Sequence, residues 1–146
     1  MSRLLPAAML LAALVAPRTP PQTGYVSRYD PGVFEGVVAH RFANDWWRNT
    51  PPDDWQTVAG YAATTDCDQV GKVVLMRPVG AETWERVLVG DCVGHVQTLN
   101  WMLDNNIVAE LDYELFTRWA SAYGVPLAVE MRSGGVRYDY ALWRYL

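Results

Sequence analysis

The stretch formed by residues 87–119 most constrains what this chain can fold into. It begins as an apolar run that ends in Asp91 and Cys92, with His95 shortly after, and it leads to Asp112 in front of an amphipathic segment. Ionisable side chains therefore stand at the ends of apolar elements, where polar groups are normally exposed. Such residues either line an active site or a binding cleft, or they only terminate strands through local hydrogen bonds.

The signals around this stretch predict short strands and one clear helix. The strongest is a hairpin in which residues 71–78 pair with residues 84–89 across a Gly-containing turn. A helix is expected over residues 113–123, because its apolar residues recur at helical spacing, Asp112 can cap it and Gly124 can end it. Further strands are expected at residues 24–29, 58–63, 107–109 and 125–131. Six or seven short strands with many Gly and Pro turns indicate a small, mostly-β barrel with helical insertions.

Three segments have weaker signals. Residues 33–42 are apolar with Gly36 among them, which favours a strand or a loop. Residues 43–57 contain polar turn residues, two prolines and the three tryptophans Trp46, Trp47 and Trp55. We expect a long irregular surface loop there, and loops of this length are often functional. Residues 99–103 are compatible with a short helix.

The composition excludes some classes of function. The formal charge of −4 argues against a protein that binds nucleic acid or an anionic membrane, since both need a basic face. Seven tryptophans and eight tyrosines are many for 146 residues. Aromatic side chains serve cores first, but exposed ones stack on sugar rings, which favours carbohydrate binding. We expect one domain that acts as a monomer without a cofactor.

The N-terminus resembles a targeting segment. Arg3 supplies a positive charge, and residues 4–15 form an apolar run that is too short to span a bilayer. We therefore expect residues 1–16 to be a cleaved signal peptide and residues 17–23 to be a Pro-rich linker. The protein is then secreted or located in the periplasm or cell envelope, without stable membrane insertion after processing.

Export bears on the two cysteines. In an oxidising compartment Cys67 and Cys92 would form a disulfide, closing a loop worth about 3–4 kcal/mol in the chain-entropy model. The alternative is a metal site that combines both cysteines with His95. Zinc usually needs a fourth ligand and C-x₂-C-type spacing, so the disulfide is favoured and no metal is expected.

Several motifs in order resemble the double-psi β-barrel domains of the rare lipoprotein A and expansin type, and the related three-aspartate domain of lytic transglycosylases. The similar segments are residues 24–32, 62–64 with 70–74, 87–95, 111–112 and 125–129. The resemblance implies a mostly-β fold, a small six-stranded double-psi β-barrel with one or two short helices over residues 24–131. Residues 132–146 would be a C-terminal extension packed on the barrel.

The resemblance also implies a site. The three-aspartate set would be Asp66, Asp91 and Asp112. The chain departs from the rare lipoprotein A pattern, because it lacks the lipidation cysteine, has Thr64 or Thr65 at the family's histidine position, and offers no Glu that can be placed after the first turn.

Each candidate residue has a structural alternative. Asp112 is the candidate general acid and Asp91 its neighbour or a stabiliser of oxocarbenium charge, but Asp112 would equally cap a helix and Asp91 would end a strand. Asp66 and His95 are candidate substrate contacts, although turn and loop roles suit them as well. The three tryptophans, Trp46, Trp47 and Trp55, would offer platforms to a glycan or would fold their loop onto the barrel.

Two functions follow from these residues. The first is an exported lytic-transglycosylase-like enzyme that cleaves peptidoglycan or a related polysaccharide with carboxylate acid/base chemistry. The second is a non-catalytic, expansin-like carbohydrate-binding module. A secreted domain that binds or inhibits another protein through the same groove is a third, weaker hypothesis.

Overall fold

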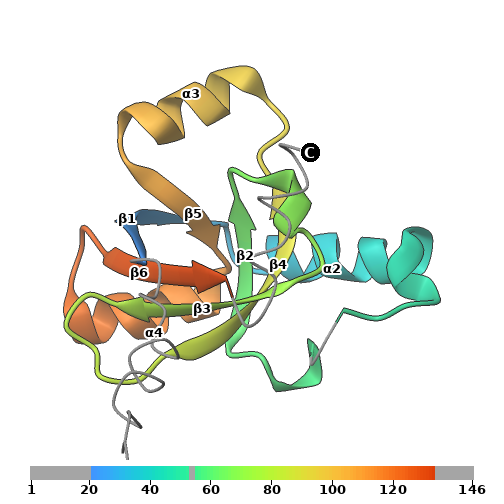
Figure 1. The fold of residues 1–146 in the computed structure, drawn as a ribbon, viewed down its shortest axis with the longest axis horizontal. Coiled ribbons are helices and arrows are strands. Elements are labelled where there is room, and N and C mark those ends of the chain that lie inside the picture. The colour runs from blue at the N-terminus through green and yellow to red at the C-terminus, as the bar shows by residue number, and fades with distance from the viewer. Residues whose placement is uncertain (1–20, 53–54, 134–146) are drawn as a thin grey trace, which may run out of the picture.

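The fold is a closed six-stranded β-barrel (Figure 1). The computed structural model describes residues 21–52 and 55–133, so the expected signal peptide, most of the expected linker and most of the expected C-terminal extension lie outside the described residues. The strands are β1 (Gln22–Arg28), β2 (Gly60–Thr64), β3 (Val73–Pro78), β4 (Glu85–Cys92), β5 (Ile107–Leu111) and β6 (Ala128–Ser133). Their order around the barrel is β1-β5-β2-β4-β3-β6. This arrangement confirms the predicted small barrel of six strands.

The barrel mixes parallel and antiparallel pairs. β1 runs parallel to β5, and β2 runs parallel to β4. The other four neighbouring pairs are antiparallel, including the β3–β4 hairpin that the sequence predicted. Both parallel pairs contain a register shift. In the pair of β2 and β4, Ala62 is aligned with Val89 and Ala63 with Asp91, so Gly90 is an additional residue of β4 between two aligned positions. Closure leaves every one of these strands with two neighbours.

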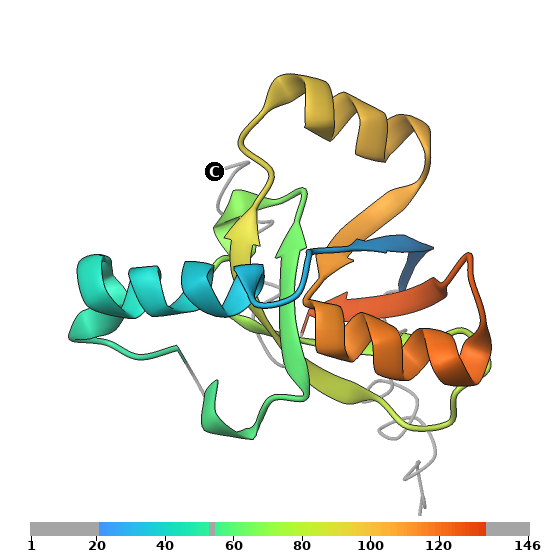
Figure 2. The same ribbon diagram turned by 180° about the vertical axis from the view of Figure 1, so that it is seen from behind.

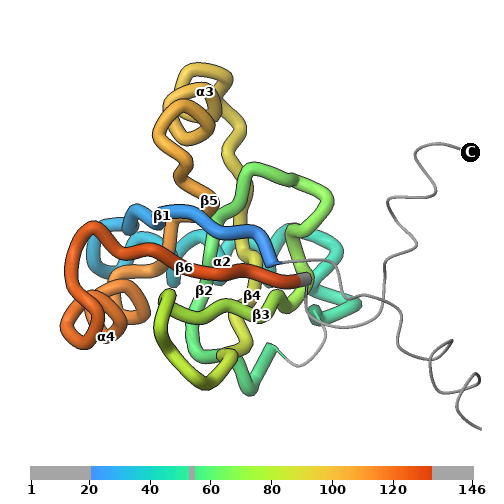
Figure 3. Tube along the Cα trace, turned by 60° about the vertical axis from the view of Figure 1, so that its left-hand side comes forward, coloured from blue at the N-terminus to red at the C-terminus, as the bar shows by residue number. Residues whose placement is uncertain are grey.

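Three α-helices accompany the barrel in the described part of the chain (Figure 2). α4 (Tyr113–Tyr123) lies where it was predicted, with Asp112 at its N-cap and Gly124 at its C-cap. α3 (Val96–Asp104) is longer than predicted and projects from one end of the barrel (Figure 3). No helix in the described residues is long and apolar enough to cross a membrane.

The helix α2 (Val33–Asn44) replaces the strand or loop that was predicted for residues 33–42. It begins after Gly32, whose positive φ of 77° suits a glycine. Phe34 and Val38 are its buried residues, one helical turn apart, and they pack on the outer face of the barrel. Gly36 is exposed and does not interrupt the helix, so the prediction of a strand or a loop for residues 33–42 was wrong.

The segment after α2 is more ordered than the predicted irregular surface loop. It contains two short 3-10 helices, η1 (Trp46–Arg48) and η2 (Trp55–Thr57). Trp47 is completely buried, so part of this segment belongs to the core. A third 3-10 helix, η3 (Cys67–Gln69), connects β2 to β3.

Two apolar clusters hold the barrel and its helices together. The interior cluster contains Val87 and Val89 of β4 and extends to Leu115 and Trp119 of α4. The outer cluster joins α2 to β2 and β4, and Leu88 belongs to it. Neighbouring residues of β4 thus face opposite sides, as strand alternation requires.

Candidate functional site

The disulfide between Cys67 and Cys92 is present, with Sγ atoms 2.09 Å and Cα atoms 5.0 Å apart. It joins η3 to the last residue of β4, next to Asp91. Because both cysteines are used in the bond, neither is a metal ligand. Within residues 21–52 and 55–133, no group of three His, Cys, Asp or Glu side chains is arranged to hold a metal ion.

Asp91 lies in an open groove between the end of β4 and α2. Its Oδ1 accepts a hydrogen bond from Nη2 of Arg41 at 2.7 Å, and Nη1 of the same arginine binds Asp45 at 2.9 Å. The register shift at Gly90 brings Asp91 opposite Ala63 of β2. The groove has a volume of about 620 Å³ and is lined by Val33, Gly36, Val37, His40, Arg41, Asp45 and Asp91. A paired carboxylate and guanidinium in such a groove offer acceptors and donors to a polar ligand.

A second carboxylate, Glu110, belongs to the same cross-strand row as Asp91, meaning the line of residues aligned with one another on neighbouring strands. Ala63 of β2 is aligned with Asp91 on one side and with Glu110 of β5 on the other. Ala63 belongs to the outer cluster, whereas Ala109 and Leu111 beside Glu110 belong to the barrel interior. Strand alternation therefore turns Glu110 to the outer face that also carries Asp91. Two strand spacings separate the Cα atoms of the two acids, roughly 10 Å.

Two hydroxyl groups accompany this pair of acids. Ser27 is the next residue in the row, aligned with Glu110, and its Oγ donates to Oε1 of Glu110 at 3.0 Å. Tyr29 directly follows the last residue of β1, and its hydroxyl makes a long contact of 3.5 Å with Oδ2 of Asp91. The groove, the row and these two hydroxyls form one polar region on the outside of the barrel.

The pKa of Tyr29 reports on both carboxylates. Burial of the phenol is the largest cause that raises this pKa, and together with the negative charges of Asp91 and Glu110, against the opposing effect of Arg41, it brings the pKa to about 12. A phenol with this pKa keeps its proton at neutral pH. Tyr29 is therefore a hydrogen-bond donor beside Asp91, within the electrostatic influence of Glu110.

Asp112 is in a different environment. It is only 3% exposed, and Oδ1 accepts the backbone N–H of Leu115 at 2.9 Å. Its Oδ2 accepts the backbone N–H of Tyr61 at 2.5 Å, while its own N–H donates to the carbonyl of Tyr61. The N-cap that the sequence predicted is confirmed, and the same side chain also ties α4 to β2. This geometry favours the structural alternative for Asp112 and does not bring it into the groove of Asp91.

The remaining predicted contacts are scattered. Asp66 is exposed and accepts the N–H of Asp68 at 3.0 Å, which is the turn role described as its alternative. His95 is exposed at the residue before α3. These positions place neither residue among those that line the groove of Asp91.

The three tryptophans have three different environments. Trp46 is 54% exposed and follows Asp45, which lines the groove. Trp47 has no exposed surface, so its expected role as a glycan platform is wrong, because a buried ring cannot stack on a sugar. Trp55 is half-buried against Phe42, with ring centroids 4.9 Å apart.

Sequence reasoning missed Arg41, Tyr29 and Glu110. The apolar–acidic–apolar order of Ala109, Glu110 and Leu111 was the one available signal, since an acid between two inward-facing residues of a strand must face outward. No protein-family model matches the chain, and no curated protein is detectably similar to it in sequence. The class that the fold itself defines is a closed, mixed, six-stranded β-barrel with a polar groove on its outer face.

Proposed function

We propose that this protein is an exported, cell-wall-active enzyme that cleaves peptidoglycan or a related polysaccharide with the carboxylates Asp91 and Glu110. The observation that carries the proposal is the cross-strand row that turns both acids to one outer face, on either side of Ala63. Asp112, the sequence-based candidate for the acid, is left with its structural role.

The double-psi type and export belong to the same proposal. Two parallel strand pairs within a closed barrel of six strands support the double-psi resemblance. The disulfide between Cys67 and Cys92 supports an oxidising compartment outside the cytosol. An exported barrel of this type suits a substrate in the cell wall.

The proposed chemistry follows from the surroundings of the two acids. Glu110 has the neutral Ser27 as its hydrogen-bond partner. In its protonated form it gives its proton to the glycosidic oxygen as the sugar–oxygen bond breaks and is left as a carboxylate. Asp91, which is ion-paired with Arg41, stabilises the positive charge that develops on the sugar ring and takes the proton of the attacking hydroxyl group. The attacking group is a water molecule in hydrolysis, or a hydroxyl of the sugar itself in a transglycosylase-type reaction.

The distance between the two acids is compatible with one acting as general acid and the other as general base. Inverting glycosidases hold their two carboxyl groups about 6.5–9.5 Å apart, which leaves room for a water molecule. Two strand spacings, roughly 10 Å between Cα atoms, allow such a separation of the side-chain ends. Tyr29, protonated and beside Asp91, supplies a donor to a substrate hydroxyl or to the carboxylate.

The experiment compares Glu110→Gln and Asp91→Asn with the wild type in the release of soluble fragments from peptidoglycan, chitin and cellulose. Each substitution should lower the rate by about 100-fold or more, because general acid–base catalysis contributes about 10²–10⁴-fold. Glu114→Gln is the matched control, since Glu114 is exposed on α4 and lies outside the row. Wild-type rates in both row variants would contradict the proposed chemistry.

A non-catalytic carbohydrate-binding module is the second candidate. The specific observation in its favour is Trp46, which is 54% exposed and directly follows Asp45, a residue that lines the groove. Binding of the wild-type protein to insoluble peptidoglycan or cellulose without release of fragments would select this function. Trp46→Ala should then weaken binding, whereas Trp101→Ala, which removes a ring of similar exposure (50%) on α3, should leave it unchanged.

A further inference from the structure

A second pocket lies on the other side of the barrel from the groove. It is formed by the turn between β3 and β4 and by the last turns of α4, whereas the groove lies against α2, and Figures 1 and 2 show these helices on opposite sides. Its volume is about 420 Å³. None of the candidate site residues named from the sequence lines this pocket.

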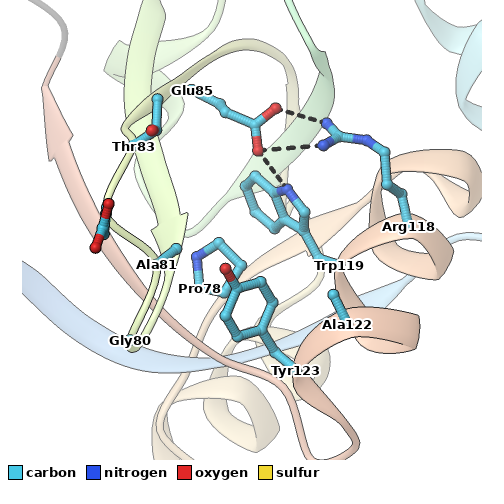
Figure 4. A pocket seen from close by; sticks show the side chains of 10 residues that line it. Pro78, Gly80, Ala81, Thr83, Glu85, Arg118, Trp119, Ala122 and Tyr123 are labelled. Carbon is cyan, nitrogen blue, oxygen red and sulfur yellow. Dashed lines mark hydrogen bonds and ion pairs between the residues drawn. The ribbon is translucent and has the colours of Figure 1, made fainter.

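The inner wall of the pocket is a hydrogen-bonded network around Glu85 (Figure 4). The carboxylate of Glu85 accepts Nη2 of Arg118 at 2.7 Å and Nη1 at 3.3 Å. It also accepts the indole Nε1 of Trp119 at 2.6 Å. Trp119 is 2% exposed and belongs to the interior cluster, so the network is anchored in the core and Glu85 keeps a fixed position.

The remaining walls combine an aromatic ring with polar groups. Tyr123 is 48% exposed and extends into the pocket beside Pro78 (Figure 4). Thr83 and Glu82 from the turn add a hydroxyl group and a second carboxylate. Arg118 is half exposed, so a ligand can reach its guanidinium.

This chemistry matches a neutral polyhydroxylated ligand. Two carboxylates against one guanidinium disfavour an anion, and Arg118 disfavours a cation at the inner wall. An extended peptide cannot add itself as a strand, because the barrel is closed and offers no free edge. A sugar ring has an apolar C–H face for Tyr123 and hydroxyl groups for a wall that holds donors and acceptors side by side. The volume lies at the lower end of the range for small-molecule sites, which suits a short saccharide segment.

We propose that this pocket is a second saccharide site, which binds one or two sugar units of a neutral glycan remote from Asp91. The inference rests on the proposed function in so far as the polymer is a glycan. A chain held at both sides of the barrel would be bound more tightly than at either site, because the second contact becomes intramolecular.

The test is calorimetric titration with chitotetraose and with cellotetraose in a Glu110→Gln background, so that no cleavage disturbs the measurement. Tyr123→Ala should weaken binding at this site about 5–10-fold, the loss expected for one aromatic contact, and Tyr123→Phe should retain most of it. Tyr25→Ala is the matched control, because Tyr25 is 42% exposed on β1 and does not line the pocket. It should bind like the wild type.

A second readout is the indole N–H signal of Trp119 in NMR spectra. This signal should shift on saturation with the saccharide, since the N–H is bonded to Glu85 at the inner wall. Wild-type affinity in Tyr123→Ala with an unmoved Trp119 signal would overturn the inference, as would the absence of binding by either saccharide. Failure of the proposed function gives a different result, namely no fragment release by the wild type while the effects of Tyr123→Ala and the shift of the indole signal remain.

Discussion

Replacing Asp112 by Asn tests whether this aspartate supports the fold or the chemistry. Its two carboxylate oxygens each accept a different backbone N–H, from Leu115 and from Tyr61, and the side chain is buried. Asn has the same shape but one acceptor oxygen, and its NH₂ group would face one of the two N–H donors. One backbone donor thus loses its partner in the interior.

The expected cost can be worked from these two bonds. Loss of an N-cap costs about 1 kcal/mol, and a buried donor without a partner costs about 1–3 kcal/mol. Asp112→Asn, which loses one of the two, should lower the free energy of unfolding by about 1–3 kcal/mol. Asp112→Ala, which loses both, should lower it by about 2–4 kcal/mol.

Urea denaturation followed by tryptophan fluorescence measures both values. With an m-value of about 2 kcal/mol per M, the midpoint of Asp112→Ala should fall by about 1–2 M. Asp104→Asn is the control, because Asp104 is exposed at the last residue of α3, and its stability should match the wild type within about 0.5 kcal/mol. An Asp112→Asn protein that is as stable as the wild type but releases no fragments would refute the structural role and restore Asp112 as a catalytic acid.

Three more outcomes follow from individual contacts. Replacing Cys67 and Cys92 by Ser should lower the free energy of unfolding by about 3–4 kcal/mol in urea denaturation, because the disulfide closes a loop across a sequence separation of 25; an equal stability would contradict this. Gly90→Ala should cost about 1–3 kcal/mol in the same assay, since a Cβ atom there would lie 2.7 Å from Cε1 of Phe34, and an unchanged midpoint would contradict this packing. In an alkaline titration followed by phenolate absorbance, one tyrosine should ionise near pH 12 and be missing from Tyr29→Phe. Because the folded state raises this pKa above the ordinary value of 10.0, the contribution of Tyr29 to stability is complete below pH 10 and is lost as the pH rises through 12.

Local signals in the sequence predicted much of the barrel. The β3–β4 hairpin and α4 were predictable because alternation, helical spacing, the cap at Asp112 and the stop at Gly124 all agree at those positions. The disulfide was predictable from the number of cysteines and from the expectation that the protein is exported. Each of these elements is decided by neighbours in the sequence.

The helix α2 was not predictable in this way. Its apolar residues Phe34 and Val38 are one turn apart, but residues 33–42 are apolar on more than one face and include Gly36, so the periodicity is weak. The helical conformation of these residues is favoured by packing on the outer face of the barrel, where the missing side chain of Gly90 leaves room for the Phe34 ring. The helix then brings Arg41 to Asp91. A tertiary contact therefore overrides an ambiguous local pattern.

The candidate site could not be predicted from the sequence for a related reason. Asp91 lies near the end of the apolar strand β4, and Asp112 directly follows the apolar strand β5. The capping signal at Asp112 was visible in the sequence, but a capping role did not exclude a place in the same groove as Asp91. Their difference arises from β2, which lies between their strands: its residue Tyr61 gives Asp112 a backbone N–H, while Ala63 is aligned with Asp91. The additional residue in β4 changes which face Asp91 occupies, so that Glu110 becomes its partner in the row. A one-residue shift in strand register thus determines which acidic side chain lies on the same face as Asp91. Register is a property of paired strands, so it cannot be read from the sequence of one strand alone.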